Sequence, residues 1–128
     1  MERTTIWVTW DREGMHRYPA APEEVAFLRH PHRHIFKFRA EIEVFHDDRD
    51  IEFFIMKKDL QENVWPLQVE FDYKSCEMLA KDVVTYLTTK YPGRSITVDC
   101  SEDGENGATL KYTPKNDSTY VDMKGNIQ

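Results

Sequence analysis

The residues of this sequence best suited to chemistry are histidines, four of which lie between positions 16 and 34. His32 and His34 are two positions apart, and on a β-strand this spacing places both imidazoles on one face. They lead the apolar face of the segment 32–45, where a desolvated imidazole pair costs stability unless both rings are satisfied. With His16 as a third ligand, the set is typical of a catalytic zinc site with one open position. The alternative is a polar strand end that binds no metal.

The other candidate groups near this pair carry less specific signals. His30 precedes Pro31 and is either a metal neighbour or general base, or an exposed loop residue. His46 lies in an acidic turn and is expected to be solvated. A cupin metal site would need a carboxylate three or four residues after the His-x-His pair, but Phe38 and Arg39 occupy those positions. The pattern therefore argues against a cupin.

Hydrophobic spacing predicts the elements that position these groups. Ser75 is a good N-cap for a helix over 75–90, in which apolar residues recur at helical spacing. Asp11–Gly14 is expected to interrupt the first strand, and a short helix is expected to begin at Lys57. This order of elements predicts an α+β fold in a single domain over 1–113, followed by a polar tail over 114–128. The predicted strands are 4–10, 32–45, 51–56, 95–100 and 109–113, with one helical turn over 23–28.

Length, charge and cysteine content limit the class of protein. The chain has 128 residues, a length that suits one domain, and its net charge of −6 argues against nonspecific nucleic-acid binding. It has no apolar run of the roughly 20 residues needed to cross a bilayer, and no secretory signal region. We therefore expect a cytoplasmic protein with no membrane partner. Cys76 and Cys100 are too few for a disulfide scaffold and are expected to be buried free thiols.

Four motifs in order along residues 4–112 resemble the 6-pyruvoyltetrahydropterin synthase and 6-carboxytetrahydropterin synthase family, whose members have the tunnelling fold. His16 matches the first histidine of that family. The run 32–34 is similar to the family's His-Gly-His, with Arg33 in place of glycine. The remaining motifs lie at 51–60, at 75–80 and at 98–102, the last with Ala108 six residues after it.

The resemblance implies a fold, a metal and an assembly. The implied fold is an antiparallel four-stranded sheet with two helices on one face, which associates into a barrel as a homo-oligomer, a hexamer of two trimers. His16, His32 and His34 would hold zinc. Glu102 would bind a pterin-like substrate by accepting hydrogen bonds from its adjacent N–H donors. The alternative for Glu102 is a solvated acid in a turn.

The resemblance also implies an activity, that of a carbon–oxygen lyase. The substrate would be 7,8-dihydroneopterin triphosphate or a related dihydropterin, with zinc as Lewis acid. The pathway is left open between biopterin, folate and the deazapurine route to queuosine.

Two departures from the family concern proton transfer. The family's catalytic cysteine falls at Leu28, which carries no proton, and neither cysteine of this chain is in position to replace it. The family's Asp-His pair falls within 61–74, a stretch without histidine. Glu24 or His30 would have to act as the base instead. Besides a zinc-dependent lyase, the sequence thus allows a non-catalytic tunnelling-fold protein that binds metal and a pterin- or purine-like ligand, or a metal-free structural oligomer.

Overall fold

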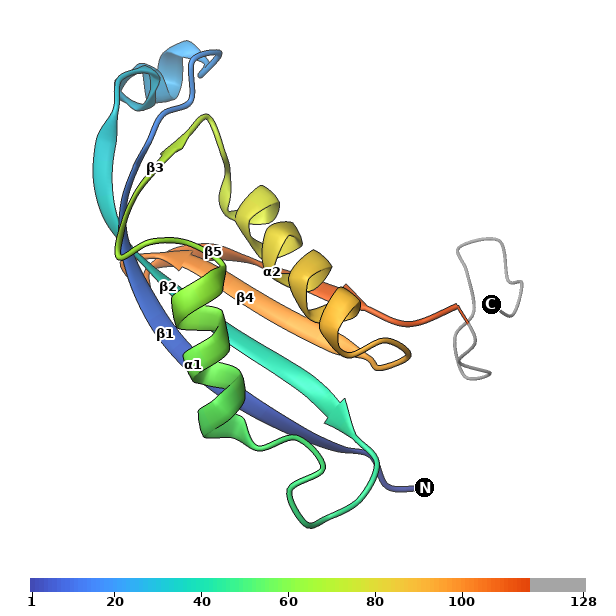
Figure 1. Cartoon of the computed structure of the whole chain (residues 1–128). Helices are drawn as coiled ribbons and strands as arrows, with labels where there is room; N and C mark the ends of the chain where they lie inside the picture. Colours follow the sequence, from blue (N-terminus) through green and yellow to red (C-terminus); the bar gives the residue numbers. More distant parts are fainter. Residues whose placement is uncertain (116–128) are drawn as a thin grey trace.

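The chain folds as an α+β unit built on one five-stranded sheet, in a computed structural model that describes residues 1–115 (Figure 1). The strand order across the sheet is β3-β1-β2-β4-β5. Figure 1 shows α1 and α2 on the same side of the sheet, with η1 at the far end of the ribbon formed by β1 and β2. Along the chain the elements are β1 (Thr4–His16), η1 (a 3-10 helix, Glu23–Arg29), β2 (His32–Val44), α1 (Phe53–Asn63), β3 (Gln68–Asp72), α2 (Cys76–Lys90), β4 (Ile96–Glu102) and β5 (Asn106–Tyr112).

The sheet is mixed, because its edge strand β3 runs parallel to β1. The four longer strands pair antiparallel in the order β1-β2-β4-β5, and the two α-helices lie between β2 and β4 in the chain. The predicted antiparallel four-stranded sheet with two helices on one face is therefore correct for these strands and omits β3.

The first strand is longer than predicted, since β1 runs without interruption from Thr4 to His16 and pairs with β2 along its whole length. The predicted break at Asp11–Gly14 is wrong. Gly14 belongs to the strand, and its lack of a side chain serves packing: a Cβ there would lie 2.5 Å from the ring of Phe71 on β3. The glycine therefore allows β3 to lie close to the end of β1.

The predicted strand over 51–56 is also wrong, because the chain is helical from Phe53 onward. Its aromatic and β-branched residues favour a strand by propensity. The side chain of Glu52 accepts a hydrogen bond from the Ile55 amide at 2.9 Å and caps the helix instead. Met56 and Leu60, four residues apart, are both fully buried on the face that packs against the sheet.

One hydrophobic core fills the space between the sheet and the two α-helices. Ser75 caps α2 by accepting a hydrogen bond from the Met78 amide at 3.3 Å, which confirms the predicted helix start. Burial of each large side chain contributes roughly 1.5–3 kcal/mol. The largest contributors are Phe36, Phe38 and Ile42 of β2, Leu79, Val83 and Leu87 of α2, Met56 and Leu60 of α1, and Ile96 and Val98 of β4.

Three further predictions concern the tail, the two cysteines and membrane spans. Most of the predicted tail, from residue 116 on, lies outside the described residues. Cys76 and Cys100 are free and buried, as predicted. Within residues 1–115, no helix has the length and apolar character that a membrane span requires.

Candidate metal centre

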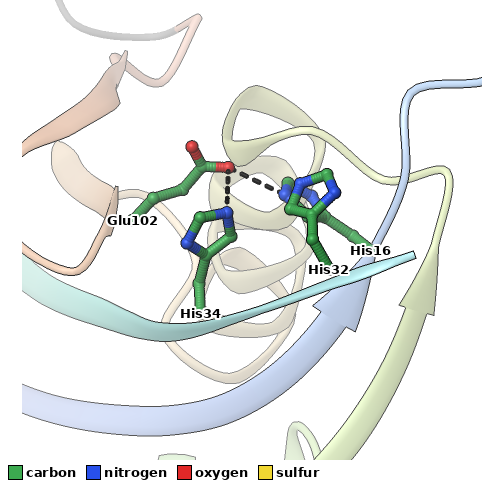
Figure 2. A group of neighbouring side chains, drawn as sticks. All are labelled: His16, His32, His34 and Glu102. Atoms are coloured by element: carbon green, nitrogen blue, oxygen red, sulfur yellow. Dashed lines mark ion pairs between the residues drawn. The ribbon is translucent and has the colours of Figure 1, made fainter. Parts of the chain in front are cut away.

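Four side chains converge at one end of the sheet, each from the end of a strand (Figure 2). His16 is the last residue of β1, His32 and His34 open β2, and Glu102 ends β4. His16 pairs directly with His32 across the ribbon. The four side chains each offer one ligand atom, and these atoms all lie within 4.8 Å of one another. The group could therefore bind a metal ion.

The strand that sequence analysis missed, β3, orients His16. It pairs with Glu13–His16, and the pairing shifts register between Met15 and His16. β3 ends at Asp72, whose φ is positive (53°), and the chain that follows brings the carbonyl of Lys74 to the Nδ1 edge of the His16 ring. The Nδ1 of His16 lies 2.9 Å from that oxygen. A carbonyl oxygen only accepts, so Nδ1 carries the proton and Nε2 points toward the other ligands.

The two β2 histidines are held in the same way by other oxygens. His32 Nδ1 lies 2.8 Å from the carbonyl oxygen of His30, and His34 Nδ1 lies 2.7 Å from the carboxylate of Asp103. Asp103 follows β4 directly and begins the tight turn into β5. Hydrogen bonds from an N–H to a carbonyl or carboxylate are the usual way in which a metal-ligating histidine is fixed in orientation and tautomer.

All three Nε2 atoms are buried and have no hydrogen-bond partner among the described residues. In a neutral ring that is protonated at Nδ1, Nε2 presents a lone pair. The lone pair of His16 faces Glu102 Oε2 at 2.8 Å, and His34 Nε2 lies 3.5 Å from the same oxygen. Lone pairs that face one another need positive charge between them. A proton satisfies one such pair, whereas a metal cation satisfies all four atoms.

Two neighbouring residues of β2, Phe36 and Arg33, define the surroundings of the four candidate ligands. The ring of Phe36 packs edge-on against His16 and His34, with centroids 5.0 and 5.6 Å away, and forms an apolar floor. Arg33, which replaces the glycine of the resembled family, points to the opposite face of β2 and pairs with Glu13 at 2.6 Å. The arginine therefore does not occupy the space between the two histidines.

A pocket of about 540 Å³ opens beside His16 and Glu102. Its size falls in the range of small-molecule sites. A larger hollow of about 690 Å³ lies between the end of α1 and α2, but none of the four candidate ligands lines it. The pocket beside the cluster is thus the better candidate for a substrate. Among its walls are Tyr18, Leu28, Tyr73, Cys76 and Met78.

The structure places the two predicted bases, Glu24 and His30, outside the four-residue cluster. Both side chains are exposed, Glu24 on η1 and His30 directly after it. His30 contacts the cluster through its backbone carbonyl oxygen, which accepts a hydrogen bond from the ring of His32. A catalytic role for either side chain stays a prediction. Glu102, predicted to bind substrate, lies among the candidate metal ligands.

Comparisons with known proteins support the fold and give no information on the chemistry of the site. No model of a known protein family matches this chain, and a search of curated proteins found no match. The crystal structure of an uncharacterized protein, WS1659 from Wolinella succinogenes, is similar, with a TM-score of 0.66 and 12% sequence identity. The match covers 87% of this chain and 99% of that one.

Proposed function

We propose that this chain binds zinc at the His16–His32–His34–Glu102 centre. With that zinc it acts as a lyase on a small dihydropterin, such as 7,8-dihydroneopterin triphosphate. The observation that carries the metal assignment is the set of three buried Nε2 atoms without a hydrogen-bond partner, two of which, those of His16 and His34, lie within 3.5 Å of one carboxylate oxygen of Glu102. The dihydropterin rests on the sequence resemblance and on a neighbouring pocket of suitable size.

Zinc is the metal that this donor set favours. Three imidazole nitrogens and one carboxylate oxygen fit its preference for four nitrogen, sulfur or oxygen ligands. Calcium and magnesium prefer oxygen donors throughout, so they suit this set poorly. Other divalent transition metals bind imidazole as well, and the affinity order alone would favour copper or nickel over cobalt and iron. Zinc is proposed because it requires no redox chemistry of the site.

The proposed reaction divides its tasks among the residues of the centre and pocket. A bound zinc ion would act as a Lewis acid that polarises a substrate hydroxyl or carbonyl. The hydrogen bonds at Nδ1 fix the three histidine rings, whose Nε2 atoms would hold the ion. Glu102 either completes the ligand set or accepts hydrogen bonds from the pterin edge. The exposed side chains of Tyr18 and Tyr73 offer flat surfaces beside the pocket for a planar ring.

The second candidate function is binding of the same metal and ligand without turnover. Leu28 favours it, because this residue lines the pocket where the resembled family has a catalytic cysteine, and it carries no proton. A positioned acid or base contributes about 10²–10⁴-fold to a rate. Without such a group, the centre would sequester or sense its ligand and not convert it.

Metal content tests the centre directly. The purified chain, reconstituted with zinc and desalted, is expected to hold about one zinc ion per chain by elemental mass spectrometry. His34→Ala should lose most of that zinc, because it removes one of the three converging nitrogens. His46→Ala is the matched control, since His46 is exposed and lies outside the cluster, and it should bind zinc like the wild type. Failure of the wild-type chain to bind zinc would refute the metal centre.

Turnover separates the two candidate functions once zinc binding is established. The zinc-loaded chain is incubated with 7,8-dihydroneopterin triphosphate, and released triphosphate and pterin products are followed by chromatography. Product formation that a chelator abolishes supports the lyase. Stoichiometric binding of the dihydropterin without product supports the binding protein.

A further inference from the structure

Two of the four candidate metal ligands also border the neighbouring pocket. His16 and Glu102 line that pocket, whereas His32 and His34 do not. The His16 side chain has 10% of its surface exposed, and the Glu102 side chain has 27% exposed. A small molecule that enters from the pocket therefore approaches the centre on this side, where the carboxylate is the more accessible of the two ligands.

The side chain of Glu102 is held less firmly than the three imidazole rings. Each ring is fixed at Nδ1 by a hydrogen bond to an oxygen atom. The carboxylate contacts the histidines through Oε2, and within residues 1–115 no hydrogen bond holds its other oxygen, which points away from the rings in Figure 2. The backbone of Glu102 is anchored by pairing with Phe36 and by a hydrogen bond from the Glu105 amide to its carbonyl at 3.0 Å. The carboxylate can therefore turn away while the backbone and the rings stay in place.

The charge of the centre favours an anion in the position of this carboxylate. Three neutral imidazoles leave a divalent cation with its full charge, and the carboxylate of Glu102 compensates part of it. Catalytic zinc sites keep three protein ligands and one exchangeable position, whereas four protein ligands are typical of structural sites. An anion that replaces the carboxylate would preserve the charge balance and leave the three rings as permanent ligands.

We propose that Glu102 is the exchangeable ligand of the centre, a role that rests on the metal binding proposed above. Glu102 completes the ligand set while the pocket is empty, and an anionic ligand that enters from the pocket displaces its carboxylate. The displaced carboxylate stays at the pocket wall, where it accepts hydrogen bonds from N–H donors of the entering ligand. The centre thus selects small ligands that combine an anionic group with N–H donors.

Cobalt(II) in place of zinc tests the exchange, because it binds the same kinds of ligand and its visible absorption changes with their number. The cobalt-loaded full chain is titrated with azide as the anion. Glu102→Ala should still bind about one cobalt ion per chain through the three histidines, with a spectrum that differs from that of the wild type. Azide should bind this variant at least about tenfold more tightly than the wild type, because it no longer competes with the carboxylate. Glu77→Gln is the matched control, since Glu77 lines the same pocket but lies outside the cluster, and it should behave like the wild type.

The outcomes separate this proposal from the metal centre on which it rests. Equal spectra and equal azide affinities for the wild type and Glu102→Ala would overturn the exchange and leave the metal centre standing. A wild-type chain that binds neither cobalt nor zinc would overturn both. Crystal structures of the zinc-loaded wild-type chain decide the question without a variant, and we expect the carboxylate of Glu102 at the ion without azide and turned toward the pocket with azide. A carboxylate in the same position in both crystals would overturn the exchange.

Discussion

At the scale of a single residue, Asp103 links the turn after β4 to the candidate metal centre. Its φ is positive (58°), a conformation that aspartate tolerates better than most residues, and Gly104 follows with φ of 77°. Its carboxylate accepts hydrogen bonds from the Ile35 amide at 2.9 Å and from the His34 ring at 2.7 Å. These two hydrogen bonds, the amide first, lower the pKa of Asp103. Asp103 therefore holds His34 as a carboxylate at neutral pH.

Replacement of Asp103 tests the value of this orienting contact. Asp103→Asn keeps an acceptor for the Ile35 amide and tolerates the positive φ, but it is a weaker acceptor for the His34 ring. We expect zinc affinity to fall by about 10–100-fold, as for other changes to groups that orient metal ligands. Competition with a chromophoric chelator measures the affinity. Glu105→Gln, an exposed change in the same turn, should leave it unaltered. Equal affinities for Asp103→Asn and the wild type would contradict the role.

The same carboxylate gives the fold a defined dependence on acid. A group whose pKa is lowered in the folded state stabilises that state above its unfolded pKa of about 3.9. That stability is lost as the pH falls through the lower, folded-state pKa of Asp103. Metal-free wild-type chain and Asp103→Asn should therefore differ more in melting temperature at neutral pH than in strong acid. A difference that stays constant with pH would contradict this linkage.

The chemistry of the site could be predicted from the sequence only in part. The alternation of β2 correctly placed His32 and His34 on one face, and His16 joins them as expected. The groups that orient the rings could not be predicted. Two of them are backbone carbonyls, of Lys74 and His30, and a carbonyl has no sequence signature. The resemblance assigned Glu102 to the substrate. Its place beside the histidines follows from the pairing of β2 with β4, which the sequence does not specify.

At the scale of elements, Arg12 joins β1 to the end of α1. Its side chain is buried, with 3% of its surface exposed. The guanidinium donates hydrogen bonds to the carbonyl oxygens of Gln61, Trp65 and Asp11. The carbonyl of Gln61 lies in the last turn of α1, where helical carbonyls lack intrahelical partners and the dipole favours a cation. Arg12 thus caps the C-terminus of α1 by donating a hydrogen bond to the carbonyl of Gln61.

Removal of this buried cation should destabilise the fold without touching the metal ligands. Arg12→Met keeps much of the apolar volume but leaves buried carbonyls without donors. We expect a loss of about 2–4 kcal/mol in the free energy of unfolding, measured by urea denaturation. Arg49→Met is the control, because Arg49 is exposed in a turn and its change should stay within about 0.5 kcal/mol. Similar unfolding midpoints for the two variants would contradict the role of Arg12.

The elements themselves were predicted unevenly, for physical reasons. Helix α2 combines a capping serine with a regular apolar stripe, so local signals and tertiary packing agree. In α1 the strand propensity of residues 53–55 conflicts with the capping by Glu52, and packing on the sheet decides the outcome. Strand β3 has five residues at the sheet edge, and only its pairing with β1 defines it.

At the scale of the whole molecule, the described sheet has unpaired strand edges. Residues 4–12 of β1 pair on one side only, with β2, and β5 is the other edge of the sheet. Exposed edges of this kind invite pairing with another chain. Head-to-tail pairing of β5 with the free edge of β1 in a second copy would close into a ring when the rotation allows it.

Light scattering coupled to size-exclusion chromatography tests the predicted hexamer. We expect a mass about six times the 15.2 kDa of one chain. Leu110→Pro removes a backbone N–H donor from the edge strand β5 and should weaken the assembly. A proline in the β4–β5 turn should leave the assembly intact. A monomeric mass at all concentrations would contradict both the hexamer and the barrel that the resemblance implies.

The candidate ligands of the proposed metal centre lie far apart in the chain, from His16 to Glu102. A growing polypeptide therefore presents its histidines early, but gains the carboxylate only after α2 and β4 have been synthesised. A truncated product that ends before β4 lacks the complete set. A metal that binds the full set would stabilise the folded state by about 4 kcal/mol when its free concentration is a thousand times the dissociation constant. Chains that contain all four ligands would therefore resist proteolysis better than truncated ones.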